Sequence, residues 1–188
     1  MNMNKKILYW AIGGVVGVVV IGIFLAQPFR KNVAVTDVDM AGPKNATYEI
    51  DGKPVTLVDG VSVVAAAPGS AAKITTQYFG NEVTHDFDGD GRPDTAFILT
   101  QNTGGSGTFF YVVAALNKPS GFVGSKGFLL GDRIAPQTTE ISRDLNKNVL
   151  IVNYADRKTG ESFAVMPSVG KSVWLLLNVK TVQFEEID

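Results

Sequence analysis

Four aspartates lie within nine residues near the middle of the chain, in the segment Asp86-Phe87-Asp88-Gly89-Asp90-Gly91-Arg92-Pro93-Asp94. Their carboxylates take the first, third, fifth and ninth positions of a D-x-D-G-D-G-x-P-D loop, and calcium prefers six to eight hard oxygen ligands. The two glycines permit the sharp bends that turn carboxylates inward, and a backbone carbonyl at the seventh position would add an oxygen. The segment therefore predicts a Ca²⁺ site formed by Asp86, Asp88, Asp90, Arg92 and Asp94.

The loop differs from an EF-hand, because its twelfth position is Phe97 instead of a bidentate glutamate and no helix is predicted on either side. It resembles the strand-loop-strand calcium site of integrin-type and FG-GAP repeats. That resemblance covers this segment alone and implies a metal-binding role for its five residues. The alternative is an acidic surface turn without an ion. Neighbouring carboxylates repel one another unless a cation neutralises them, so we favour a structural calcium site with a Kd on the order of 0.1 to 1 mM.

Two further residues could take part in catalysis, but their surroundings favour structural roles. His85, the only histidine, precedes the aspartate loop, and a catalytic histidine needs a nucleophile or an orienting carboxylate that the sequence does not identify. Ser106 lies in a GGSGT segment that lacks the G-x-S-x-G spacing and precedes a predicted strand, where a nucleophile elbow requires a helix. We expect a loop or hairpin at these glycines.

Two Asp-Arg pairs, Asp132-Arg133 and Asp156-Arg157, each follow a predicted strand, and Tyr154 is close in sequence. With Gln137, Thr138 and Thr139 they could line a polar cleft for a saccharide or peptide. Ion pairs that tie loops to the sheet explain them as well, and we favour that account. The alternative is an envelope hydrolase that uses the Asp132, Tyr154, Asp156 and Arg157 region.

Short runs of Val, Ile, Phe, Tyr and Trp predict the strands that position these residues. Residues 95–100, 108–116, 149–154 and 173–179 are apolar on both faces, which predicts central strands. Further strands are expected at 47–50, 53–57, 61–66, 73–79, 122–130, 162–165 and 181–187, with a turn at Gly80-Asn81 and a short broken helix within 65–72. About ten strands without crossover helices predict an all-β, mainly antiparallel fold, either a sandwich or a partly closed barrel.

An apolar run near the N-terminus predicts one transmembrane helix. Residues 7–26 carry no charge over 20 positions, which at 1.5 Å per residue spans a bilayer core of roughly 30 Å. A cleaved signal peptide is the alternative, but the run exceeds the usual apolar region and no good cleavage site follows. Lys5 and Lys6 favour the N-terminus inside, although Arg30 and Lys31 on the other side keep this bias small. We therefore expect a short cytoplasmic tail (1–6), an anchor (7–26), a stalk (27–44) and an extracytoplasmic β-rich domain (45–188).

The composition excludes several classes. There is no cysteine, so disulfides, thiolate metal sites and lipid attachment to cysteine are excluded. Four of the 17 basic residues flank the apolar run, which leaves 13 basic against 18 acidic residues, a charge of −5. A nucleic-acid partner is not expected for such a surface.

Most of the expected outer domain resembles a family of small bacterial envelope proteins, many of which are lipoproteins. This chain lacks their acylated cysteine and has the apolar run in its place. The resemblance implies the bacterial envelope as the location. It rests on residues 73–80, the aspartate loop, and the segments 100–109, 130–141 and 152–157.

These observations favour a non-enzymatic binding or scaffold module of the bacterial envelope, anchored by one helix, stabilised by calcium and able to bind an envelope protein or a saccharide. Two alternatives remain. One is the envelope hydrolase, and the other is a small subunit of a membrane complex, to which the Gly13 and Gly17 pair of the apolar run could contribute.

Overall fold

The computed structural model describes residues 42–143 and 148–187 of the 188-residue chain. The predicted tail, anchor and all but the last residues of the stalk lie outside this part. Among the described residues, no helix has the length and apolar character needed to cross a membrane. The only helix described there is a short 3₁₀ helix, Pro43–Asn45, and the rest consists of antiparallel strands and their connections.

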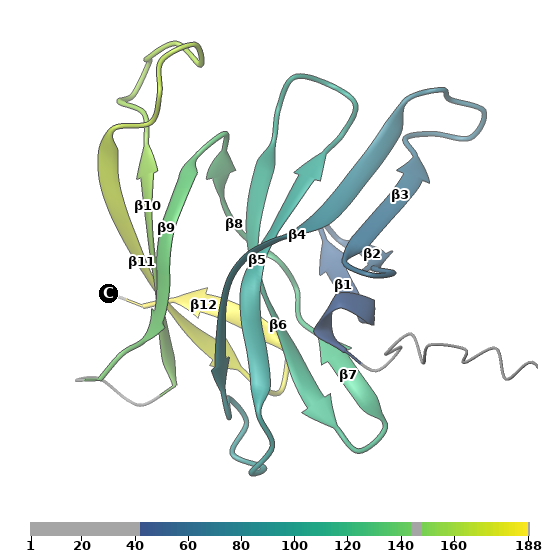
Figure 1. Ribbon diagram of the computed structural model, residues 1–188, viewed down its shortest axis with the longest axis vertical. Coiled ribbons are helices and arrows are strands. Elements are labelled where there is room, and N and C mark those ends of the chain that lie inside the picture. The colour runs from purple at the N-terminus through teal and green to yellow at the C-terminus, as the bar shows by residue number, and fades with distance from the viewer. Residues whose placement is uncertain (1–41, 144–147, 188) are drawn as a thin grey trace, which may run out of the picture. The chain divides into compact units, whose positions relative to one another are not determined.

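The strands form two larger sheets and one hairpin (Figure 1). The hairpin joins β1 (Thr47–Ile50) to β2 (Lys53–Thr56). The six-stranded sheet contains, in spatial order, β3 (Val61–Ala65), β4 (Lys73–His85), β5 (Asp94–Asn102), β6 (Phe109–Lys118) and β7 (Gly121–Gly124), and β8 (Phe128–Asp132) also pairs with β6. The four-stranded sheet has the order β12 (Gln183–Glu186), β11 (Val169–Asn178), β10 (Val149–Asp156) and β9 (Ala135–Ile141).

The pair β5 and β6 forms the middle of the core. Alternate residues of a strand point to opposite faces, and both faces of this pair are apolar. On one face, Ile98 and Val112 pack with residues of the four-stranded sheet. On the other face, Phe97 and Val113 pack with the β1–β2 hairpin. The expected central strands at 95–100 and 108–116 are therefore confirmed, and the fold is sandwich-like and antiparallel without a closed barrel.

The other two expected central strands are buried differently. Val173, Leu175 and Leu177 of β11 face the core, but Trp174 is 37% exposed and points away from it. The four-stranded sheet is thus an outer layer that buries mainly one face. Both strands are central in position, since β10 and β11 are the inner strands of the four-stranded sheet.

Several local predictions were wrong. The segment 122–130 is two strands, because Ser125 interrupts it: the Ser125 hydroxyl accepts a hydrogen bond from Ala114 N and donates one to Lys126 O. Residues 65–72 form a hairpin turn instead of a helix, closed by the hydrogen bond from Ala66 N to Ala72 O. Strand β4 continues through Gly80-Asn81 with register shifts, where a turn was expected.

Two more differences concern polar segments. Strand β9 was missed, since its sequence APQTTEI has neither a long apolar run nor a clear alternation. Residues 162–165 were expected to form a strand but lie in the β10–β11 loop, where the Phe163 ring packs under the guanidinium group of Arg133 at 3.6 Å.

Gly124 marks the closest approach between the hairpin and the large sheet. A Cβ at this position would overlap the carbonyl oxygen of Thr47 and lie 2.7 Å from the Tyr48 ring. We expect Gly124→Ala to lower the free energy of unfolding by about 1–3 kcal/mol, because β1 must move away. Urea unfolding followed by circular dichroism measures this. Gly170→Ala is the control, since a Cβ there meets no atom within 4 Å. Equal stability of the two variants would contradict the close approach.

Candidate metal centre

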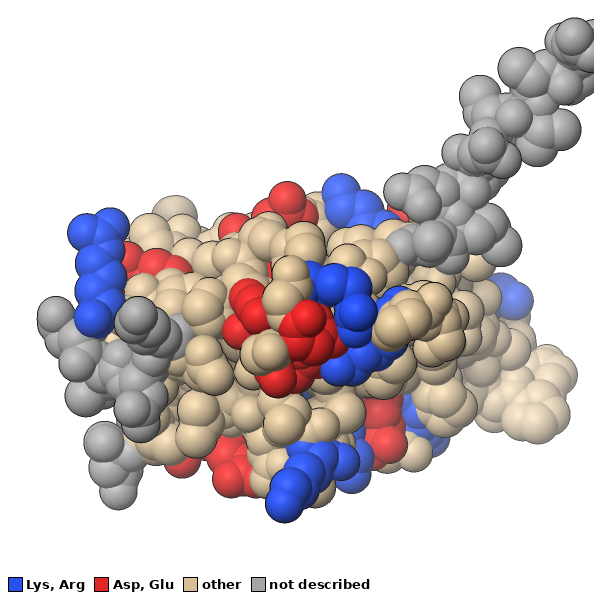
Figure 2. Space-filling view, turned by 90° about the horizontal axis from the view of Figure 1, so that it is seen from below, with Lys and Arg blue, Asp and Glu red and all other residues tan. Residues whose placement is uncertain are grey.

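The aspartate loop connects β4 to β5 and lies beside the β6–β7 turn, at the lower end of the sheet in Figure 1. Strand β4 ends at His85, and β5 begins at Asp94. Lys118 ends β6 and reaches the loop from the neighbouring hairpin. Figure 2 views the molecule from this end and shows acidic and basic side chains next to one another.

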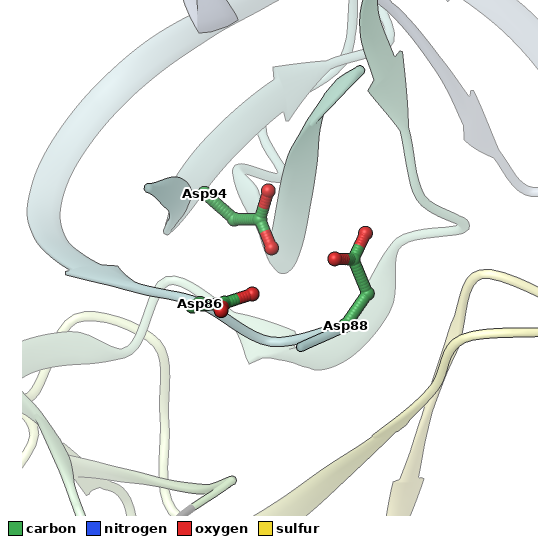
Figure 3. A group of neighbouring side chains, drawn as sticks. All are labelled: Asp86, Asp88 and Asp94. Carbon is green, nitrogen blue, oxygen red and sulfur yellow. The ribbon is translucent and has the colours of Figure 1, made fainter. Parts of the chain in front are cut away.

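Three of the predicted ligands converge. One carboxylate oxygen from each of Asp86, Asp88 and Asp94 lies within 4.8 Å of the other two, and the side chains point toward one another (Figure 3). Asp94 is fully buried, and the Asp88 side chain is only 5% exposed. The sequence motif therefore folds into a cluster of hard oxygen atoms that could hold a metal ion.

Asp86 shapes the loop around its own carboxylate. Its Oδ1 accepts hydrogen bonds from Gly89 N at 2.8 Å and Asp90 N at 3.1 Å, and its Oδ2 accepts one from Gly91 N at 2.9 Å. The glycines adopt φ values of +76° and +83°, which L side chains rarely tolerate. The expected role of the glycines in the sharp bends is confirmed.

Asp94 ties three segments together. Its Oδ2 accepts a hydrogen bond from Phe87 N at 2.9 Å, and its Oδ1 accepts one from Asn117 N at 2.7 Å. Burial raises the pKa of the Asp94 carboxyl above its ordinary value, and the nearby Asp88 and Asp90 carboxylates raise it further, against the two N–H donors that lower it. A cation at this position would favour the ionised carboxylate.

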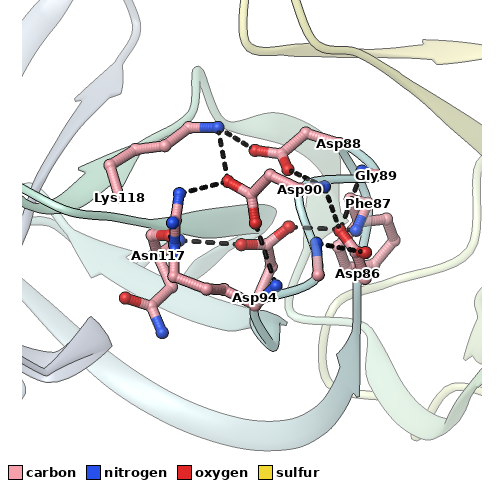
Figure 4. Close-up of polar contacts among 10 residues, drawn as sticks. Asp86, Phe87, Asp88, Gly89, Asp90, Asp94, Asn117 and Lys118 are labelled. Carbon is pink, nitrogen blue, oxygen red and sulfur yellow. Dashed lines mark hydrogen bonds and ion pairs between the residues drawn. The ribbon is translucent and has the colours of Figure 1, made fainter.

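Asp90 contacts two basic side chains instead of joining the other three carboxylates (Figure 4). The Asp90 carboxylate turns to the Arg92 guanidinium group at 2.5 Å and to the Lys118 ammonium group at 3.1 Å. Arg92 N also donates to Asp90 Oδ1, and this bond is the main cause that lowers the pKa of Asp90. Asp90 lies outside the group of three converging carboxylates, and the Arg92 carbonyl stays a predicted ligand.

Lys118 is the contact that sequence reasoning missed. Its ammonium group donates to the Asp88 and Asp90 carboxylates, which together raise the pKa of Lys118. The predicted strands could have revealed this contact. An antiparallel pairing of 95–100 with 108–116 places the end of the second strand, where Lys118 lies, beside the start of the first strand, which follows the aspartate loop. Lys118 supplies positive charge next to the aspartate cluster.

His85 lies next to the loop in sequence but outside the group of converging carboxylates. Its Nε2 lies 3.0 Å from Asn148 Oδ1, and its ring contacts Phe87 edge-on with centroids 5.2 Å apart. These contacts are compatible with the structural role expected for His85. Ser106 lies in the β5–β6 hairpin loop, as expected from the glycines around it.

The first Asp-Arg pair is used within the fold. Arg133 forms a bidentate ion pair with the Asp132 carboxylate, with Nη2 at 2.6 Å from Oδ2 and Nε at 3.1 Å from Oδ1. Asp132 Oδ1 also accepts a hydrogen bond from Thr108 N at 2.8 Å. Burial raises the pKa of Asp132, but these partners outweigh it and lower the pKa below its ordinary value.

The second pair ties the β10–β11 loop to the connection between β8 and β9. The Arg157 guanidinium group donates to the carbonyl oxygens of Val165 at 2.6 Å, Phe163 at 3.3 Å and Arg133 at 2.7 Å. The Asp156 carboxylate accepts from Arg157 N and from the Lys171 ammonium group.

The structure thus brings both Asp-Arg pairs together, with each carboxylate paired to donors. Tyr154 belongs to the core between the sheets. Its hydroxyl pKa is raised by burial. Of the polar residues expected beside the pairs, Thr138 accepts a hydrogen bond from Asn153 within the four-stranded sheet. This arrangement matches loop-tying ion pairs, and no observation among the described residues favours the hydrolase hypothesis.

Asp94→Asn tests the position of Asp94 in the fold. The amide would accept from only one of Phe87 N and Asn117 N and would turn an N–H₂ group toward the other donor. We expect the free energy of unfolding to fall by about 2–4 kcal/mol, since a buried donor loses its partner. Urea unfolding in chelator measures the change, with exposed Asp59→Asn as the control. A loss below about 0.5 kcal/mol would contradict the bridging role.

Comparisons with known protein families, with curated proteins and with solved structures found no match for this chain. The resemblances to integrin-type loops and to small envelope proteins therefore stay predictions from the sequence.

Proposed function

We propose that this chain is a non-enzymatic binding or scaffold module of the bacterial envelope, anchored in a membrane by residues 7–26 and stabilised by one Ca²⁺ ion at the aspartate loop. The observation that carries the calcium part is the convergence of Asp86, Asp88 and Asp94. The anchor rests on the 20 uncharged residues of the sequence.

The spacing of the three oxygens suits one ion. Ca²⁺ binds oxygen at 2.3–2.6 Å, so two ligands on opposite sides of it lie at most about 5 Å apart. The three carboxylate oxygens lie within 4.8 Å of one another, which is inside that limit. Further oxygens would complete the coordination. They could come from water, from backbone carbonyls such as that of Arg92, and from Asp90 once it releases the Arg92 and Lys118 side chains.

The ligand chemistry favours calcium over other cations. The converging group contains carboxylates alone, and soft or borderline metals prefer imidazole or thiolate ligands. Mg²⁺ demands near-ideal octahedral geometry and keeps several waters, whereas Ca²⁺ accepts an irregular set of oxygens. Calcium is also abundant outside the cytoplasm, where we expect this domain.

The position of the loop favours a structural role for the ion. Asp86 follows the end of β4, and Asp94 begins β5 and hydrogen-bonds to Asn117 of β6. An ion held here would fasten the end of the two most deeply buried strands. At ten times its dissociation constant it would add about 1.4 kcal/mol to the free energy of unfolding, which is enough to fix the loop without deciding the fold.

Calorimetric titration of the chelator-treated, full-length protein with CaCl₂ tests the proposal. We expect one ion per chain with a Kd on the order of 0.1 to 1 mM. Asp88→Asn should weaken binding at least about tenfold, because it removes a converging carboxylate, whereas exposed Asp59→Asn should bind as the wild type does. Absence of binding by the wild type at about 10 mM calcium would rule out the site.

Lys118→Met tests competition between the ammonium group and the ion. Lys118 must give up its contacts with Asp88 and Asp90, or stay beside a divalent cation, when calcium binds. We expect the variant to bind calcium about tenfold more tightly, which corresponds to one lost charged contact. The control is Lys126→Met, whose ammonium group lies 3.6 Å from Glu49 Oε1. Weaker binding by Lys118→Met would mean that Lys118 positions the ligands instead.

A further inference from the structure

Strand β3 is an edge strand with apolar side chains on both of its faces. It pairs with β4 on one side, and no described strand lies on its other side. Val63 and Val64 point to opposite faces and are 57% and 52% exposed. Unprotected edges of this kind are templates for strand pairing.

The free backbone groups of this edge can be located from its register. Tyr78 N donates to Gly60 O, so Gly60, Ser62 and Val64 direct their backbone groups toward β4. Residues between them direct theirs outward. The outward groups of Val61 are bonded to Val58, which leaves the N–H and C=O groups of Val63 and Ala65 open.

The edge also lacks the charges that keep edges apart. The 13 residues from Gly60 to Ala72 contain no charged side chain. By contrast, β2 carries Lys53 and Pro54, and β12 carries Glu185 and Glu186. Charge and proline are the usual protections of an edge strand, and β3 has neither.

We propose that β3 pairs with β3 of a second copy of this chain, as antiparallel strands related by a two-fold axis at Val64. In this register Val63 lies opposite Ala65 of the copy, and Ala65 lies opposite Val63 of the copy. Each pair exchanges two hydrogen bonds, so all open groups of Val63 and Ala65 are satisfied. The two Val64 side chains meet at the axis as a directly opposed pair.

A second copy fits this edge for reasons of symmetry and charge. A two-fold axis requires a self-complementary surface, and the two open residues lie symmetrically about Val64. Two uncharged edges meet without repulsion. Val64 also lines a pocket of about 180 Å³ with the apolar residues Ile50, Val55 and Ile74. The oppositely charged Asp51 and Lys53 line the same pocket, so the Val64 side chain of the copy would arrive beside a mainly apolar surface without a net charge. The short edge implies a weak pairing that a shared membrane would strengthen by raising the local concentration.

Disulfide cross-linking of the full-length protein in phospholipid vesicles tests the pairing. The natural chain has no cysteine, so only introduced thiols react. Directly opposed residues of a non-hydrogen-bonded pair have Cα atoms about 4.5 Å apart, within the range of a disulfide. With a copper–phenanthroline oxidant, we expect Val64→Cys to form covalent dimers at least about tenfold faster than Val63→Cys. Residue 63 lies opposite residue 65 of the copy, so the two thiols of Val63→Cys would not face each other.

Two controls separate strand pairing from other contacts. Val123→Cys places a thiol on an exposed valine of β7, at the other edge of the sheet, and should cross-link slowly. Adding Val63→Pro to Val64→Cys removes an outward N–H that β4 does not use and should slow cross-linking to the rate of Val123→Cys, with an unchanged circular dichroism spectrum. Equal rates for Val64→Cys, Val63→Cys and Val123→Cys, or no dimer at position 64, would overturn the proposal.

Discussion

The burial of β5 and β6 on both faces is the constraint on which the other layers depend. Alternate side chains of the same two strands supply two separate cores, one shared with the four-stranded sheet and one shared with the β1–β2 hairpin. Neither outer layer has a comparable second face, since Trp174 of β11 and Lys53 of β2 are exposed. The central pair therefore fixes where the hairpin, the large sheet and the outer sheet must lie.

The pairing of β5 with β6 also determines the geometry of the aspartate loop. Asp94 starts β5, and Asn117 and Lys118 end β6, so the hairpin register brings a buried carboxylate, a backbone donor and an ammonium group to one place. The loop neutralises its carboxylates in two ways. Asp86 is surrounded by backbone N–H groups, while Asp90 engages Arg92 and Lys118. Asp86 nevertheless converges with Asp88 and Asp94, and these three carboxylates form the group on which the calcium proposal rests.

The sequence predicted the parts of the fold that depend on local apolar patterns, and it failed where polar residues decide. Residues 96–99 and 109–116 are apolar at every position, and both segments lie in central strands. The polar strand β9 was missed, and the division at Ser125 depends on a hydroxyl contact with Ala114, which no local pattern reveals. For the candidate site, the aspartate spacing identified the converging carboxylates. The ion pairs that turn Asp90 away required knowledge of the strand pairing.

The layered arrangement also sets the order in which backbone amides can open to solvent. Removing the β1–β2 hairpin exposes one face of β6, but its amides stay bonded to β5, β7 and β8. Exchange with deuterated water at Val112 or Val113 thus requires separation of strands within the sheet, close to global unfolding. We expect the β10–β11 loop to open at a lower free energy, because its apolar residues Phe163, Val165 and Met166 are exposed. Because the loops open before the central strands do, the centre of the sheet stays rigid while the conformation of the turns at its ends can change.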